Sequence, residues 1–99
     1  MAVCSDYEGT YTVTETSCGS GCTIPASSTL EVVCSPSMQL LVDSTGYSAA
    51  INTSGQLEVA ALGLVASGTG STPNRYLFGT AQGSSLLDGS TEVWGAEQG

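Results

Sequence analysis

The sequence contains no histidine and no lysine, and Arg75 is the single cation beside nine acidic residues. Histidine is the only side chain whose unperturbed pKa lies near neutrality, so its absence removes the commonest general base and the commonest metal ligand. Without an imidazole or a lysine, no serine or threonine can be activated as a hydrolytic nucleophile within a single chain. We therefore expect a protein that is not an enzyme and that uses no cofactor.

Positive charge is too scarce for two common classes of partner. The formal net charge is -8, which repels a phosphate backbone, and no basic stripe is present that could release counterions from nucleic acid. No stretch approaches the ~20 consecutive apolar residues that a membrane span requires. The N-terminus also lacks the basic and apolar regions of a signal peptide. We expect neither nucleic acid nor a membrane as a partner.

Aromatic and charged residues are also few, at 6% and 10% of the chain. Ninety-nine residues are enough for one domain, expected to span 1–99, whose modest core buries somewhat over ~60% of the surface of the unfolded chain. With so few aromatic side chains, stability depends on many small contacts. We therefore expect additional covalent stabilisation.

Four cysteines, all in the first third of the chain, could supply it: Cys4, Cys18, Cys22 and Cys34. An even number of cysteines in a small chain favours disulfides. Cys18 and Cys22 flank a flexible Gly19-Ser20-Gly21 segment, which favours a local bridge between them and leaves Cys4 to pair with Cys34. Free buried thiols and a four-thiolate zinc site are the alternatives, and for zinc the spacing lacks paired C-x2-C knuckles.

Alternating polar and apolar residues predict the secondary structure. Between residues 7 and 16, Tyr7, Tyr11 and Val13 fall on one face and threonines fall on the other, which is typical of a half-buried strand. Further short strands are predicted at residues 30–34, 38–42, 47–52, 75–80, 86–87 and 91–94. Together with residues 56–66, they predict an all-β fold: a small antiparallel sandwich or barrel of seven to eight short strands, with a cysteine-stapled N-terminal loop.

Two segments carry particular predictions. Residues 56–66 fit either a helix or a strand, and we favour a strand with a bulge near Gly63, because both flanking segments have a period of two. Asp88-Gly89, between two short apolar runs, predicts a type I′ hairpin turn.

The acidic residues suggest no site. The run Leu40-Leu41-Val42 before Asp43 is similar to the strand that presents the catalytic carboxylate in retroviral-type aspartic proteases, but a residue intervenes in the required Asp-Thr-Gly. We interpret Asp43 as the first position of a type I turn. Asp6, Glu8 and Glu15 are oxygen ligands of the kind that calcium prefers, yet no calcium-binding loop is present. We expect solvated charges and no metal.

Three residues are candidates for an interface: Arg75, Tyr76 and Trp94. Arginine forms two-pronged contacts with carboxylates, and tryptophan and tyrosine are enriched at the energetic centres of interfaces. The alternatives are an internal salt bridge for Arg75 and core positions for the two aromatic side chains. The sequence does not decide between these possibilities.

By elimination, we expect a non-enzymatic structural protein that docks on a larger protein surface or self-assembles as a homo-oligomer. A small virion decoration, or cement, protein is the version that we favour, located on a virion or outside the cell. The alternative is a secreted, lipocalin-like mini-barrel that binds a small apolar ligand. Its cavity would be lined by Tyr11, Val13, Leu57, Val59 and Phe78.

Overall fold

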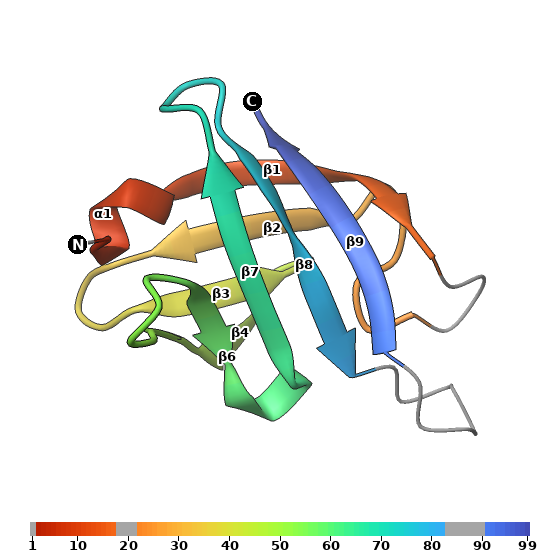
Figure 1. The fold of residues 1–99 in the computed structure, drawn as a ribbon, viewed down its shortest axis with the longest axis horizontal. Helices are drawn as coiled ribbons and strands as arrows, with labels where there is room; N and C mark the ends of the chain where they lie inside the picture. The colour runs from red at the N-terminus through yellow and green to blue at the C-terminus, as the bar shows by residue number, and fades with distance from the viewer. Residues whose placement is uncertain (1, 18–21, 83–90) are drawn as a thin grey trace.

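The computed structural model of the protein describes residues 2–17, 22–82 and 91–99. Within these ranges, nine antiparallel strands form one sheet that curves into a nearly closed barrel (Figure 1). The order of strands across the sheet is β4-β3-β2-β1-β9-β8-β7-β6-β5. In chain order the elements are α1 (Cys4–Tyr7), β1 (Gly9–Thr16), β2 (Thr29–Val33), β3 (Gln39–Val42), β4 (Thr45–Ser48), β5 (Ala50–Ile51), β6 (Leu57–Val59), the 3-10 turn η1 (Ala60–Leu62), β7 (Leu64–Thr69), β8 (Tyr76–Gln82) and β9 (Thr91–Gln98).

The two edges of the sheet are joined by the chain itself. Only Ala49 separates β4 from β5, although these strands lie at opposite ends of the strand order. The chain therefore passes directly from pairing with β3 to pairing with β6. The pairing of β1 with β9 joins the two halves of the sheet, and the chain itself connects the edge strands β4 and β5.

The expected all-β class is confirmed, but the structure contains nine strands in its described residues rather than seven to eight. One cause is the bend at Ala49, which divides the single strand expected at residues 47–52 into β4 and β5. Another is the segment 56–66, which also divides into two strands. The run expected at residues 86–87 and the Asp88-Gly89 turn lie outside the described residues.

Residues 56–66 form a hairpin, so the prediction of one bulged strand is wrong. β6 and β7 pair antiparallel, with Leu57 opposite Ala66 and Val59 opposite Leu64, and η1 makes the connection. Gly63 takes a positive φ of 55° there, which a residue with a side chain adopts only with strain. The phase shift in the sequence therefore marks a reversal of the chain.

The predicted alternation of inward and outward side chains near the N-terminus is confirmed. Tyr7 ends α1 and the strand begins at Gly9, while Tyr11 and Val13 point inward and the intervening threonines are exposed. The interior is filled by the chain's own buried side chains: Tyr7, Tyr11, Val13, Ile24, Leu30, Val32, Leu40, Leu57, Val59, Leu64, Ala66, Leu77, Ala81, Trp94 and Ala96. Phe78 is not among them, because it lies on the outer face with 41% of its surface exposed.

A disulfide joins Cys4 of α1 to Cys34 after β2, with a Cα–Cα distance of 5.9 Å. This is the pairing that we favoured for these two cysteines, and it excludes a zinc site made of all four thiolates. Cys18 lies outside the described residues, so the bridge between Cys18 and Cys22 stays a prediction. The staple ties α1 to the sheet.

The turn between β3 and β4 differs from the type I turn expected at Asp43. Asp43 and Ser44 are the two central residues, and both have positive φ angles, 47° and 76°. This is the signature of the type I′ turn, whose twist matches that of antiparallel strands. The Asp43 carboxylate accepts a hydrogen bond from the backbone N–H of Thr29 at 2.9 Å. This contact ties the turn to the start of β2.

The described residues contain no helix that is long and apolar enough to cross a membrane.

Candidate functional site

The three interface candidates do not form one surface. Arg75 and Tyr76 are neighbours at the start of β8, but the Arg75 side chain lies at an end of the barrel interior, whereas Tyr76 lies on the outer face. Trp94 is only 2% exposed and belongs to the core. Its indole N–H is buried without a hydrogen-bond partner among the described residues, and it is a core residue rather than an exposed anchor.

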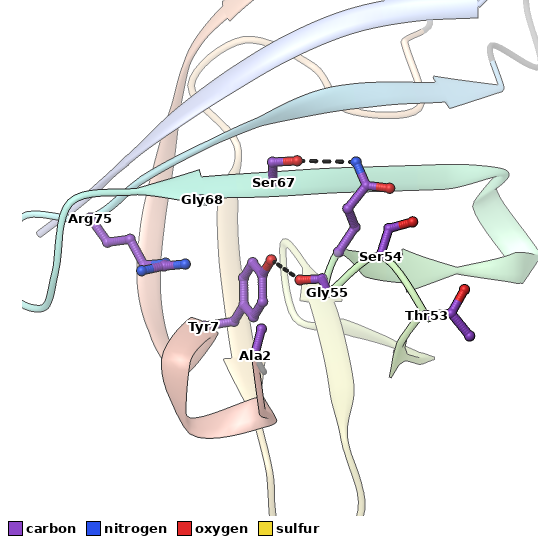
Figure 2. Close-up of a pocket in the computed structure, with 9 residues that line it drawn as sticks. Ala2, Tyr7, Thr53, Ser54, Gly55, Ser67, Gly68 and Arg75 are labelled. Carbon is purple, nitrogen blue, oxygen red and sulfur yellow. Dashed lines mark hydrogen bonds between the residues drawn. The ribbon is translucent and has the colours of Figure 1, made fainter.

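The guanidinium of Arg75 lies over the ring of Tyr7, with its Cζ 4.9 Å from the ring centroid (Figure 2). Nη1 donates a hydrogen bond to the carbonyl of Gly70 at 2.9 Å, and Nε is buried without a partner. The alternative of an internal salt bridge does not hold among the described residues, since none of their carboxylates lies within 4.0 Å of this cation. An aromatic face takes the place of the acid.

Gly68 makes room for this arrangement. A Cβ atom at this position would lie 2.6 Å from Nη2 and 2.7 Å from Cζ of Arg75, which is too close for non-bonded atoms. The guanidinium therefore packs against the Gly68 backbone and lies near the Tyr7 ring. A glycine at position 68 leaves the space that this side chain occupies.

These residues border a cavity of about 450 Å³ at the end of the barrel, here called the Arg75 cavity. Tyr7 is fixed as one wall, because its hydroxyl donates to the carbonyl of Gly55 at 2.7 Å. On another wall, Gln56 Nε2 donates to Ser67 Oγ at 3.1 Å (Figure 2). The complete lining is Ala2, Tyr7, Thr53, Ser54, Gly55, Gln56, Ser67, Gly68 and Arg75.

A second feature occupies the outer face of β8 and β9. The rings of Tyr76 and Phe78 stack with their centroids 6.1 Å apart. The Tyr76 hydroxyl reaches over β9 and donates a hydrogen bond to the carboxylate of Glu15 on β1. Gly95 lies between them, and a Cβ there would be 2.7 Å from Tyr76 Cζ, so only glycine lets the ring cross the strand.

The contact with Glu15 changes the acidity of Tyr76. The hydrogen bond to the carboxylate, followed by partial desolvation and by the charges of Glu15 and Glu97, raises the pKa of Tyr76 to about 12. The phenol therefore stays protonated and acts as a fixed donor across the physiological range. Burial likewise raises the pKa of Tyr11 in the interior.

Exposed apolar side chains adjoin this pair. Val93 is 57% exposed and Phe78 is 41% exposed, and a shallow depression of about 300 Å³ lies between them and Glu15. We call Glu15, Tyr76, Phe78 and Val93 the outer β8–β9 face. Sequence reasoning identified Tyr76 as an interface residue but not Glu15 or Val93. Alternation in β9 could have identified Val93, because a buried Trp94 places its neighbour Val93 on the outer face.

Sequence reasoning also missed Tyr7, Gly68 and Gln56 at the Arg75 cavity. No local signal could have found them, because they come from α1, β7 and the turn before β6.

In the described part of the chain, no group of three or more His, Cys, Asp or Glu side chains is placed to hold a metal ion. Comparison of this chain with protein-family models, with curated proteins and with solved structures found no match.

Proposed function

We propose that this protein is a non-enzymatic docking protein that attaches through its outer β8–β9 face to a larger protein surface. A virion decoration protein is the version that we favour. The observation that carries the proposal is the exposure of Phe78 and Val93 beside the hydrogen-bonded Tyr76–Glu15 pair. Phe78, Val93 and Tyr76 line the same shallow depression, and contiguous exposed apolar side chains are typical of interaction sites.

The outer β8–β9 face is already ordered. The Phe78 ring stacks on Tyr76, and Tyr76 is held by Glu15. Binding through such a face costs less conformational entropy than binding through freely rotating side chains. Tyrosine and other aromatic residues also supply most of the binding energy in typical interfaces. These features favour a docking role.

The charge of this face favours a basic partner. Glu15 and Glu97 are exposed carboxylates beside the apolar side chains, and the whole chain carries a net charge of -8. A complementary surface would offer an apolar depression for Phe78 and Val93, surrounded by lysine or arginine. We therefore propose a basic protein surface as the occupant, and a second copy of this acidic chain fits less well.

The apolar-ligand carrier is less well supported. Four of the five residues that would line its cavity, Tyr11, Val13, Leu57 and Val59, are buried in a filled core, and Phe78 faces outward. The cavity that does exist is bordered by a cation and by polar side chains.

A co-sedimentation experiment tests the docking proposal. The protein is mixed with virions from the source that encodes it, and binding of wild type is compared with binding of F78S/V93S. Val3 is 54% exposed and lies outside this face, so V3S is the matched control. We expect wild type and V3S to sediment with the particles and F78S/V93S to lose at least about tenfold in affinity, as is typical of central interface positions.

Light scattering gives the complementary measurement of self-association. A monomer that does not sediment with the particles, or a folded F78S/V93S variant that binds as well as wild type, would overturn the proposal. Circular dichroism of each variant establishes that a loss of binding is not a loss of fold.

A further inference from the structure

The only cation of the chain lies in a cavity without a carboxylate partner among the described residues. We propose that the Arg75 cavity binds the terminal carboxylate of an extended peptide, with the last residues of that peptide lying along the edge of β7. The site is separate from the outer β8–β9 face, and the inference holds whether or not that face docks on a particle.

Three neighbours hold the guanidinium. Gly70 accepts a hydrogen bond from Nη1, the Tyr7 ring lies near Cζ, and Gly68 packs against the Nε–Nη2 side, where Nε is buried. Nη2 has no acceptor among the described residues and is not a buried atom. A carboxylate in the cavity can therefore accept a charge-assisted hydrogen bond from Nη2.

The adjacent edge of the sheet has room for an extended chain. β6 pairs with β7 only as far as Ala66, whereas β8 pairs with β7 as far as Thr69. In the described part of the chain, no strand lies beside the β6-facing edge of residues 67–69, and the cavity is located there, bordered by Ser67 and Gly68. Addition of a short extended segment to such an edge is a common mode of peptide recognition.

Size and charge limit the ligand further. A volume of about 450 Å³ lies within the range of ~300–1,000 Å³ that small-ligand sites span, so only the last few residues of a peptide fit. One cation balances one negative charge, and the net charge of -8 opposes any additional one. The peptide therefore ends in a free carboxylate and carries no acidic side chains near it.

A pair of peptides tests the carboxylate requirement. Acetyl-Gly-Gly-Gly with a free carboxylate and the same peptide with a C-terminal amide differ only in the charged group. Binding is followed by the ¹H–¹⁵N resonances of wild-type protein, in which the only arginine gives a single side-chain Nε–H signal. We expect saturable shifts of this signal and of Gly68, and an affinity at least tenfold lower for the amide. Equal affinity of the two peptides would overturn the inference.

Acetate and two variants complete the experiment. Acetate binding as tightly as the peptide would overturn the role of the β7 edge, whereas weaker binding supports it. R75Q is expected to lose binding, R75K to retain a weakened part of it, and F78S, on the outer face, to bind as wild type. An R75Q variant that folds and binds normally would overturn the inference. If R75Q fails to fold, the wild-type titration decides: an Arg75 Nε–H signal that does not shift at peptide saturation would overturn the inference.

Discussion

The carboxylate of Glu92, which is fully buried in β9, accepts the backbone N–H of Ile24 at 2.7 Å. It also accepts the N–H of Thr23 at 2.8 Å. Residues 22–28 form neither helix nor strand, so their backbone donors need partners from elsewhere. A charged acceptor for two donors is the strong form of hydrogen bond, and it holds this loop against the end of the sheet.

Removing that carboxylate should destabilise the fold. E92A leaves two backbone donors without an acceptor and creates a cavity, so we expect a loss of about 3 kcal/mol in the free energy of unfolding. E92Q keeps one acceptor oxygen and should lose less. Urea denaturation measures both, and E31A, at an exposed position of β2, is the control, expected to change stability by no more than about 0.5 kcal/mol. A fully stable E92A would contradict this role.

The hydrogen bond between Tyr76 and Glu15 should appear in an alkaline titration. Subtracting the ultraviolet titration of Y76F from that of wild type isolates Tyr76, whose pKa is raised to about 12. E15Q should lower this pKa toward the ordinary value of about 10. E97Q should lower it less, because Glu97 contributes only through its charge. Equal shifts in the two variants would argue against the hydrogen bond.

The same titration has a consequence for stability. The pKa of Tyr76 is higher in the folded protein than in the unfolded chain, so its contribution is fully present below pH about 10. It is lost as the pH rises through about 12. Thermal unfolding between pH 9 and pH 12 should therefore show a smaller decline for Y76F than for wild type. An identical pH dependence of the two proteins would exclude this contribution.

Gly79 should tolerate substitution poorly. It lies in β8 opposite Ala66, and a Cβ there would lie 2.7 Å from the Ala66 Cα. Because the neighbour is backbone, it cannot move aside, and we expect G79A to lose about 1–3 kcal/mol in the free energy of unfolding. G46A is the matched control in β4, where the nearest atom to a new Cβ is 3.6 Å away. Equal stability of the two variants would show that the strands separate easily.

The Cys4–Cys34 disulfide closes a sequence separation of 30 residues. A loop of that length contributes about 3–4 kcal/mol in the chain-entropy description. C4A/C34A should therefore unfold at a markedly lower temperature than wild type, as scanning calorimetry would show. Because α1 carries Tyr7, we also expect the peptide affinity of the Arg75 cavity to fall in this variant. A variant with unchanged melting temperature would mean that the sheet alone holds α1.

The sequence by itself determined the elements whose pattern is local. Alternation in residues 9–16 set which side chains of β1 point inward, because successive residues of a strand face opposite sides. Composition also determined that Arg75 is the only positively charged side chain available to bind an anion. The division of residues 56–66 into two strands could not be predicted from the sequence, because a bulge and a turn both shift the phase of an apolar pattern.

Only the tertiary structure decided what each candidate residue contacts. Tyr7 and Arg75 are far apart in the chain, and their contact follows from the pairing of β1 with β9 and of β9 with β8. Tyr76 could reach Glu15 only because a glycine, Gly95, occupies the strand between them. Such contacts depend on strand register, which is a property of the whole sheet, whereas the alternation of a strand is a property of its own residues.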